Sequence, residues 1–397
     1  MCLGFWIPVG SRDESPPEAG ATHLIEHLLF KGSQKYSAEE IAQIFDTLGG
    51  ELNAATSREY VVVYGRFLDV DLEKAMDVLV DMLLFPRFAD LDREREVVLE
   101  EIAMYEDSPQ DVIHDLTAET VFGAHPLGHP VLGSRETIGN MPEAEIRSYH
   151  DHHFRFSDMV VAAAGRIDHD RLRELLLAEH GENAGGNVVR VDEKPGIAPR
   201  RTFFSKETEQ MHVCLGGEGI KRNDERRYVL SVADSLLGGS MSSRLFQEVR
   251  EKRGLAYSIY SFSSMYRETG MCGVYFGCRP DRLGQVTEVV AAELRRLCTE
   301  PVPADELERA KDHLKGRIIL GLESTSSRMT RLGRAVLTGS EIYGLDEIAA
   351  RIDAVTSEEV LALAEEVFSV DSLSVVGLGA DQSVFEAAVP PEGLSRI

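Results

Sequence analysis

The elements predicted for the first half of the chain recur loosely in its second half, and this repeat constrains the fold most. Apolar spacing and β-propensity predict, in the first half, helix 17–31, a helix from Ser37, strands 51–56 and 59–68, helices 71–85, 90–106 and 109–121, strand 159–164 and a helix from Asp168. The second half is expected to hold helices 224–237 and 242–252, strands 256–265 and 271–278, and helices 281–298 and 304–320. We therefore predict an α+β fold of two homologous α/β sandwich domains, each with helices packed on one face of a mostly antiparallel sheet.

A stretch rich in glycine, asparagine, proline and charged residues separates the two halves. It contains Gly185-Gly186 and Pro195-Gly196, a composition typical of a linker. The length of 397 residues fits two or three domains. We place the first domain at 1–184, the linker at 185–200 and the second domain at 201–397.

The most specific motif is the pentapeptide HLIEH, which runs from His23 to His27. On a helix, residues three or four apart lie on one face, so both imidazoles can reach a single metal ion with Glu26 beside them. This arrangement suits zinc-assisted hydrolysis, in which the carboxylate takes a proton from water. A chance match in a chain with 12 histidines is the alternative.

A third metal ligand is expected on the predicted helix 90–106, which is rich in glutamate. Glu94 and Glu101 lie seven residues apart, so two helical turns place them on the same face. A carboxylate there would complete a His₂Glu site and leave one position open for water. The alternative is an acidic helix face that only contacts solvent.

Five blocks of the chain resemble, in the same order, those of the pitrilysin-type inverzincin peptidases. The first block, GATHLIEHLLFKG at 20–32, resembles the zinc-binding block of that family, and most closely that of its mitochondrial-processing-peptidase branch. The other four blocks lie at 48–59, 93–101, 125–128 and 243–257. The resemblance covers nearly the whole chain.

This resemblance implies a role for each candidate residue of the first domain. His23, His27 and Glu101 match the family's ligands for one Zn²⁺ per chain, and Glu26 matches its general base. Glu94 matches a second glutamate that assists catalysis without binding the metal. These roles make the first domain the catalytic, zinc-binding one.

The resemblance also implies where a peptide substrate binds. Asn53 and Ala54 match an edge strand that pairs with the peptide backbone. Arg250 and Tyr257 match an arginine–tyrosine pair that holds the substrate from the second domain. The second half has no HxxEH motif, so 201–397 is expected to bind substrate without binding zinc.

The implied activity is that of a zinc metalloendopeptidase acting on unfolded or presequence-like peptides. Two-domain relatives work as pairs, so a homodimer or a pair with a homologous subunit is expected. The alternative is a catalytically inactive or regulatory partner subunit. A third class, metal-dependent lyases acting on a small thioether, also uses HxxEH, but those chains are much shorter and lack a duplicated half.

The composition limits which binding partners and which cellular location are expected. The net charge of −25 argues against nucleic acid as a partner. This charge would attract a basic substrate, or it serves solubility alone. The five cysteines are odd in number and form no CxxC pair, which favours reduced thiols in the cytoplasm. No apolar run reaches membrane-spanning length, so stable membrane insertion is not expected.

The start of the chain departs from the family. Residues 1–6 resemble the family's second strand, so one strand of the first sheet is expected to be missing, which would leave an unpaired edge. We leave open whether the native chain extends upstream of Met1.

Two other polar segments invite functional interpretations. The cluster His150-Asp151-His152-His153 could bind metal, but His150 and His152 would point apart on a helix, so a polar surface turn is the default prediction. Gly238-Gly239-Ser240 lacks the Lys-Ser/Thr of a phosphate-binding loop. We expect it either to end a helix or, as the resemblance implies, to lie near the entrance of a substrate chamber.

Overall fold

The structure is a computed structural model, and it describes residues 1–180, 190 and 193–390. The chain forms two compact units. The first comprises Met1–Met104, His129–Val191 and Gly321–Ile342, and the second comprises Tyr105–Gly128, Asp192–Leu320 and Tyr343–Ile397. Each half of the sequence therefore contributes one segment to the unit formed mainly by the other half.

The first unit is built on a four-stranded sheet with the order β2-β3-β1-β4, in which all neighbours are antiparallel. Its strands are β1 (Cys2–Ile7), β2 (Glu51–Thr56), β3 (Val61–Arg66) and β4 (Val160–Ala164). Its helices are α1 (Ala21–Leu29), α2 (Ala38–Thr47), α3 (Leu72–Leu84), α4 (Leu91–Glu106), α6 (Arg135–Asn140), α7 (Glu143–His153), α8 (His169–His180) and α12 (Thr325–Leu337).

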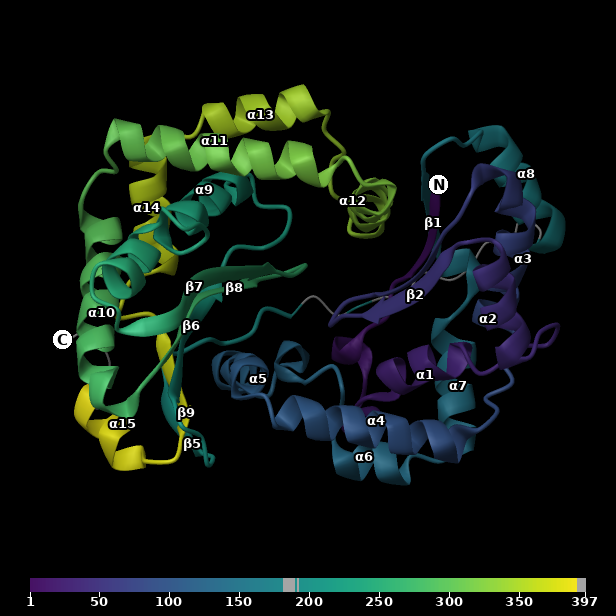
Figure 1. Ribbon diagram of the computed structural model, residues 1–397, viewed down its shortest axis with the longest axis horizontal. Coiled ribbons are helices and arrows are strands. Elements are labelled where there is room, and N and C mark those ends of the chain that lie inside the picture. Colours follow the sequence, from purple (N-terminus) through teal and green to yellow (C-terminus); the bar gives the residue numbers. More distant parts are fainter. Residues whose placement is uncertain (181–189, 191–192, 391–397) are drawn as a thin grey trace. The chain divides into compact units, whose positions relative to one another are not determined.

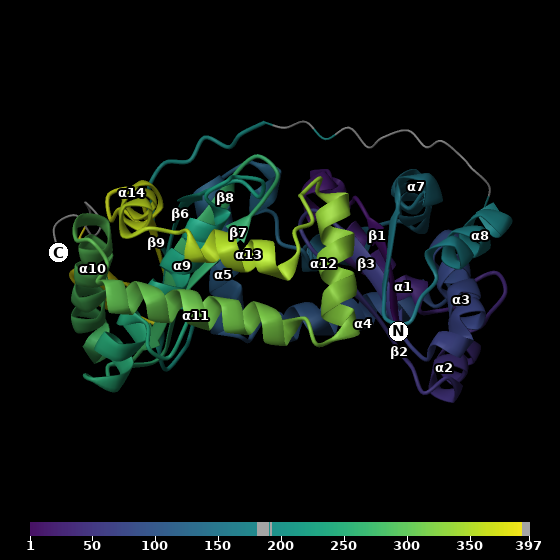
Figure 2. The same cartoon turned by 90° about the horizontal axis from the view of Figure 1, so that it is seen from above.

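Helices cover both faces of this sheet (Figure 1). Leu3, Phe5 and Ile7 of β1 point into the main core with α1, α2 and α3. The alternate residue Trp6 packs on the opposite face against Met329 of α12, and its indole N–H lies 3.4 Å from the Met329 sulfur. Figure 2 shows α12 running across this face. Strand β1 is therefore apolar on both faces because each face has its own helical cover.

The second unit is built on a five-stranded sheet with the order β5-β9-β6-β8-β7. Strand β5 is parallel to β9, and the other neighbours are antiparallel. The strands are β5 (Arg201–Ser205), β6 (Met211–Gly219), β7 (Ala256–Met265), β8 (Gly270–Cys278) and β9 (Ser374–Gly379). The helices are α5 (Pro109–Phe122), α9 (Arg227–Leu237), α10 (Leu283–Thr299), α11 (Ala304–Gly321), α13 (Leu345–Asp353), α14 (Ser357–Val367) and α15 (Gln382–Ala388).

In the second unit, too, one helix covers the face opposite the main core. Ile113 of α5 is fully buried against Cys214 and Val376 of the sheet. The close approach depends on Gly216 of β6, where an added Cβ would lie 2.6 Å from a methyl carbon of Thr117. Helix α5 comes from the first half of the sequence, and α12 of the first unit comes from the second half.

The predicted α+β class is confirmed, and so are most of the predicted elements. The prediction that helices cover one face of each sheet is wrong, because α12 covers the second face of the first sheet and α5 that of the second. Strands 51–56 and 256–265 were predicted with the bounds that the structure shows. The first helix is shorter than predicted because it begins only after Gly20, whose φ of +89° is left-handed. The helix expected at 242–252 is a π-helical turn at Phe246–Glu251.

The remaining expectations concern the linker and the membrane. The expected linker at 185–200 lies partly outside the described residues, and its described part, 190 and 193–200, contains no helix or strand. Among the helices that the structure describes, none is both long and apolar enough to span a bilayer.

Candidate metal centre

Helix α1 carries the HxxEH motif and is anchored at its N-terminus by a buried carboxylate. Glu14, which is 4% exposed, accepts the backbone N–H of Gly20 at 2.7 Å and that of Thr22 at 2.8 Å. These donors belong to the first turn, where a helix has no internal acceptors. Burial raises the pKa of Glu14 to about 8, while the two N–H donors oppose the rise. The helix is thus fixed at the end nearest His23.

Three side chains converge from two helices. His23 and His27 lie one turn apart on α1, with ring centroids 4.8 Å apart. Glu101 of α4 brings one carboxylate oxygen to 3.1 Å from His27 Nε2 and 3.6 Å from His23 Nε2. Potential ligand atoms of the three residues all lie within 4.8 Å of one another, and the described residues contain no other such group of three.

This donor set fits a zinc ion. Two ligands at zinc-binding distance in a tetrahedral site lie about 3.3 Å apart, close to the separations between Glu101 and the two imidazoles. Burial, with the nearby His27, lowers the pKa of His23 to about 4, so its imidazole is neutral at pH 7 and free to bind metal. The side chain of Glu101 is 44% exposed, which leaves the centre open to water.

Glu94 lies behind the three donors. Its side chain is 3% exposed, and one oxygen lies 3.8 Å from His27 Nδ1, the imidazole nitrogen that does not face Glu101. The other oxygen forms an ion pair with Lys31 Nζ at 2.8 Å. A carboxylate at this place can orient an imidazole and fix its tautomer.

The carboxylate of Glu26 contacts strand β2. Its carboxylate accepts a short hydrogen bond from the hydroxyl of Thr56, at the end of β2. Burial raises the pKa of Glu26 above its ordinary value of 4.5, and the Glu101 carboxylate adds to the rise, whereas Thr56 and His27 oppose it. A raised pKa brings a carboxylate closer to the range in which it exchanges protons near neutral pH.

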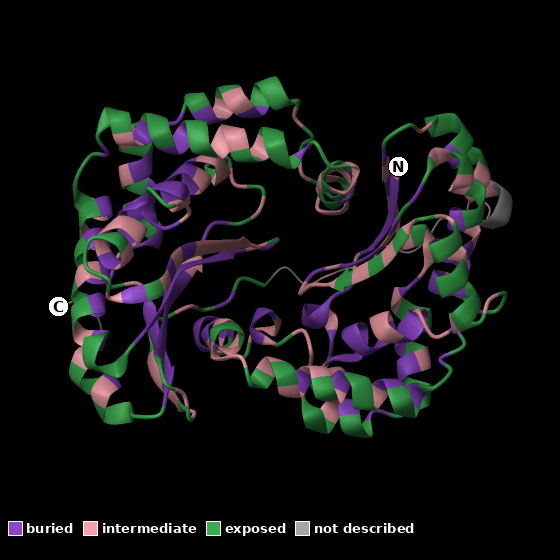
Figure 3. Ribbon diagram, viewed as in Figure 1, coloured by how far each residue is buried: buried purple, intermediate pink, exposed green. Residues whose placement is uncertain are grey.

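The strand beside Glu26 is an edge strand. Among the described residues β2 pairs only with β3, and its residues are alternately exposed and half-buried (Figure 3). Asn53 is exposed, and Ala54 is half-buried towards the core. The free edge of β2 therefore runs towards Thr56 and Glu26.

Arg250 and Tyr257 lie next to each other in the second unit. The Arg250 guanidinium is 4.4 Å from the centre of the Tyr257 ring, and its Nη1 donates to the Tyr257 carbonyl oxygen at 3.1 Å. Tyr257 is 74% exposed. The structure thus brings together these two residues, which are seven positions apart: Arg250 lies in a π-helical turn and Tyr257 at the start of β7.

The histidine cluster at 150–153 is not a surface turn, so that prediction is wrong. These residues form the end of α7. His150 is buried, stacks on Phe154 at 5.0 Å, and places Nε2 2.8 Å from the Leu83 carbonyl oxygen. His150 is a core residue whose ring nitrogen has a backbone hydrogen-bond partner.

The segment Gly238-Gly239-Ser240 follows a helix, as one of the two expectations for it stated. Helix α9 ends at Leu237, and Gly238 is its C-cap.

Three neighbours of the centre were not predicted. Lys31 follows His27 by four residues, a spacing that could have suggested a shared face. Thr56 lies in the same sequence block as Asn53, and strand alternation could have marked it. Glu14 gives no signal in the sequence, because its partners are backbone groups that only the folded loop brings near.

Comparisons with known proteins identify the family. A model described as "Insulinase (Peptidase family M16)" matches 2–135, and one described as "Peptidase M16 inactive domain" matches 140–314. An uncharacterized zinc protease of Streptomyces coelicolor is 44% identical over 386 residues, covering 94% of this chain and 84% of that protein. An uncharacterized zinc protease of Bacillus subtilis is 40% identical over 373 residues, covering 94% of this chain and 91% of that protein.

Solved structures share the fold. A structure described as a peptidase M16 inactive domain from Pseudomonas fluorescens superposes with a TM-score of 0.88 at 22% identity, covering 96% of this chain and 93% of that chain. A protease from Helicobacter pylori gives a TM-score of 0.88 at 21% identity, with 95% and 94% covered. The sequence matches over both halves show that this chain belongs to the insulinase family of peptidases, family M16.

Proposed function

We propose that this protein is a zinc-dependent endopeptidase, with His23, His27 and Glu101 as the ligands of one Zn²⁺. The observation that carries the proposal is the convergence of two imidazoles and one carboxylate within 4.8 Å. The names of the zinc proteases from Streptomyces coelicolor and Bacillus subtilis agree with it. When bound, zinc supplies a Lewis acid that polarises the scissile carbonyl and makes water more acidic.

The protein's own groups then carry the proton and hold the substrate. Glu26 takes the proton of the attacking water and passes it to the leaving amine, and Thr56 holds its carboxylate in place. Glu94 acts as a positioning residue through His27. The peptide backbone adds to the edge of β2 at Asn53 and Ala54. Arg250 and Tyr257 donate hydrogen bonds to a peptide carbonyl of the substrate.

The substrates we propose are unfolded or presequence-like peptides. Pairing with a strand edge reads the backbone and tolerates many sequences, which suits extended chains better than folded proteins. We also propose a homodimer or a pair with a homologous subunit, located in the cytoplasm, where the five free cysteines would stay reduced. A strictly monomeric, fully active protein in light scattering would contradict the pairing.

The test combines metal analysis with a Glu26→Gln variant. The purified protein should contain one zinc per chain and cleave a peptide library, with products mapped by mass spectrometry and lost in a chelator. Glu26→Gln should keep the zinc and lower the cleavage rate by about 10²–10⁴-fold, the usual contribution of a general base. Glu96→Gln, an exposed change on α4, is the matched control.

The outcomes distinguish an active peptidase from a catalytically inactive or regulatory subunit. Full activity of Glu26→Gln would exclude its role as the base. Zinc binding without cleavage of any peptide would favour the alternative, a catalytically inactive or regulatory partner subunit.

A further inference from the structure

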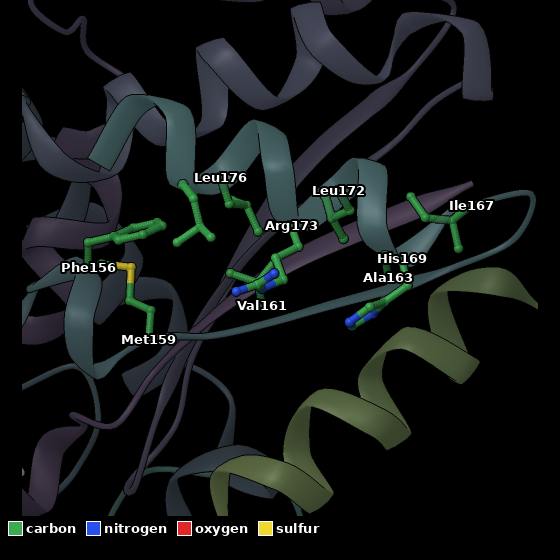
Figure 4. Close-up of a pocket in the computed structure, with 10 residues that line it drawn as sticks. Phe156, Met159, Val161, Ala163, Ile167, His169, Leu172, Arg173 and Leu176 are labelled. Atoms are coloured by element: carbon green, nitrogen blue, oxygen red, sulfur yellow. The ribbon is translucent and has the colours of Figure 1, made fainter. Parts of the chain in front are cut away.

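Buried contacts of two kinds occur away from the metal donors. In the first unit, a pocket of about 350 Å³ lies between β4 and α8 (Figure 4). Its lining is apolar except at His169 and Arg173, so most contacts in it are non-directional. The second unit contains a buried contact of the opposite kind, which is charged and directional and involves Arg244.

Arg244 lies just before the π-helical turn and forms a bidentate ion pair. Its side chain is buried, and its Nε and Nη2 donate to the two carboxylate oxygens of Glu306 at 2.7 and 3.0 Å. Glu306 belongs to the first turn of α11. Two parallel hydrogen bonds fix both the position and the plane of a guanidinium. The neighbouring Leu245 and Val249 are fully buried as well, but their apolar contacts have no preferred direction.

A second carboxylate adds to the forces that keep Arg244 in place. Glu293 of α10 is 9% exposed, and its burial raises its pKa, while the positive charges of Arg296 and Arg244 oppose the rise. If Arg244 moved away, Glu293 would lose part of this compensation and Glu306 would lose its partner, which is costly for buried carboxylates. Arg244 is therefore held by charges on two helices, α10 and α11.

The direction of Arg250 depends on the turn that follows Arg244. The turn is π-helical, and the Lys252 N–H donates to the Gln247 carbonyl oxygen, five residues earlier, at 2.9 Å. Turns of this kind are rare and often lie at functional sites. A return to α-helical bonds, four residues apart, would rotate Arg250 relative to Arg244 by about 100°, the angle of one residue on an α-helix. Fixing the start of the turn therefore helps to decide where Arg250 points.

We propose that Arg244 is a positioning residue, whose ion pair with Glu306 holds the π-helical turn in the register that presents Arg250 and Tyr257 to a peptide carbonyl. This inference rests on the proposed function, in which Arg250 and Tyr257 hold the substrate. Arg244 itself is buried and does not touch the peptide. It acts through the turn and through the stacking of Arg250 on the Tyr257 ring at 4.4 Å.

The kinetic test uses Arg244→Lys, which keeps the charge but cannot form the bidentate pair. The probe is a quenched fluorescent peptide with a sequence that the parental protein cleaves in the library. KM should rise by about tenfold and kcat should change by less than about twofold, because a contact that holds the substrate is weakened. A merely structural role would lower the amount of folded enzyme, and hence the apparent kcat, at an unchanged KM. Arg309→Lys, an exposed change at another ion pair of α11, is the matched control and should leave KM unchanged.

A double-mutant cycle shows whether Arg244 acts through Arg250. Arg250→Gln should raise KM by about 10- to 100-fold, the usual loss for a hydrogen bond from a charged group. In that background Arg244→Lys should raise KM by less than about threefold, because the group that it positions is gone. An equal rise of KM in both backgrounds would overturn the inference, and so would an unchanged KM in the single variant.

A spectroscopic readout separates this inference from the proposed function. With fluorinated tyrosine in the protein, fluorine NMR detects each ring, and Tyr257→Phe identifies the signal of Tyr257. Arg244→Lys should shift that signal, because Arg250 stacks on the ring, and Arg309→Lys should not. A shifted signal in a protein that cleaves no peptide would contradict the proposed function and still support the positioning of the pair by Arg244. An unshifted signal in the folded variant would overturn the inference, whatever the activity.

A second variant serves if Arg244→Lys does not fold. Glu306→Gln keeps the volume of a side chain that is 21% exposed, and its amide can accept only one of the two hydrogen bonds from Arg244. It should raise KM and shift the Tyr257 signal in the same direction as Arg244→Lys. Parental values of both quantities in the folded Glu306→Gln protein would overturn the inference.

Discussion

Replacing Glu94 by glutamine tests whether a residue behind the metal centre tunes it. The substitution keeps the volume of a side chain that is 3% exposed and removes its charge. Glutamine can still accept a hydrogen bond near His27 Nδ1, but it cannot balance the positive charge that a metal places on the imidazole. It also leaves Lys31, now 2.8 Å from Glu94, without its ion-pair partner near the dication.

Losing a residue that orients a metal ligand typically lowers metal affinity by 10- to 100-fold. One feature of the structure places Glu94→Gln near the lower limit. The distance of 3.8 Å to His27 Nδ1 exceeds that of a good hydrogen bond. We therefore expect a loss of about tenfold, or about 1.4 kcal/mol of binding free energy.

The assay is a competition titration of zinc between the metal-free protein and a chromogenic chelator at pH 7. Glu96→Gln, which removes an exposed carboxylate from the same helix, controls for the change in net charge. If Glu94→Gln binds zinc as tightly as the Glu96→Gln control, Glu94 does not act through His27, and its burial has another cause.

Three further predictions concern single groups. At pH 9, above the Glu14 pKa of about 8, Glu14→Gln should lower the free energy of unfolding in urea by about 1–3 kcal/mol, because an amide leaves at least one of the two N–H donors of α1 without its acceptor; an unchanged midpoint would show that water replaces the carboxylate. Gly333→Ala should destabilise the first unit by about 1–3 kcal/mol, since the added Cβ would lie 2.0 Å from Trp6 Nε1. The fluorescence of Trp6, the single tryptophan, reports this transition, and parental stability would contradict the packing of α12. In the metal-free protein the pKa of Glu26 should exceed 4.5, because its burial favours the protonated form, and added zinc should lower it; carbon NMR titration measures both, and a value at or below 4.5 without metal would refute the account.

The sequence predicted those parts of the fold and the site that depend on spacing along one element. Helical periodicity alone places His23 and His27 on one face of α1. The capping box of Ser37 with Glu40 marks the start of α2 in the structure as it does in the sequence. Glu101 was harder to identify, because α4 contains several glutamates and only the resemblance singled out this one.

Contacts between distant segments could not be predicted in this way. Periodicity shows that α12 has an apolar stripe, but it does not show which sheet the stripe covers. The contact of Trp6 with Met329 joins residues 323 positions apart, and it places a helix from the second half of the chain on the first sheet. For the same reason the packing of α5, which comes from the first half of the chain, on the second sheet was not predicted. The burial of β1 on both faces also had no visible cause in the sequence.

The repeated plan also explains why, among the described residues, the group of three metal donors lies in the first unit and has no counterpart in the second. Helices α9 and α11 take the places in the second unit that α1 and α4 take in the first. Between them, the Ser235 hydroxyl lies 3.3 Å from His313 Nδ1. A hydroxyl and one imidazole fall short of the three or four strong donors that a zinc site needs. The carboxylates have also gone, since Arg309 and Gly316 of α11 stand opposite Glu94 and Glu101 in the repeat. Under the proposed function the second unit does not bind metal, and we propose that its exposed Arg250–Tyr257 pair holds the substrate instead.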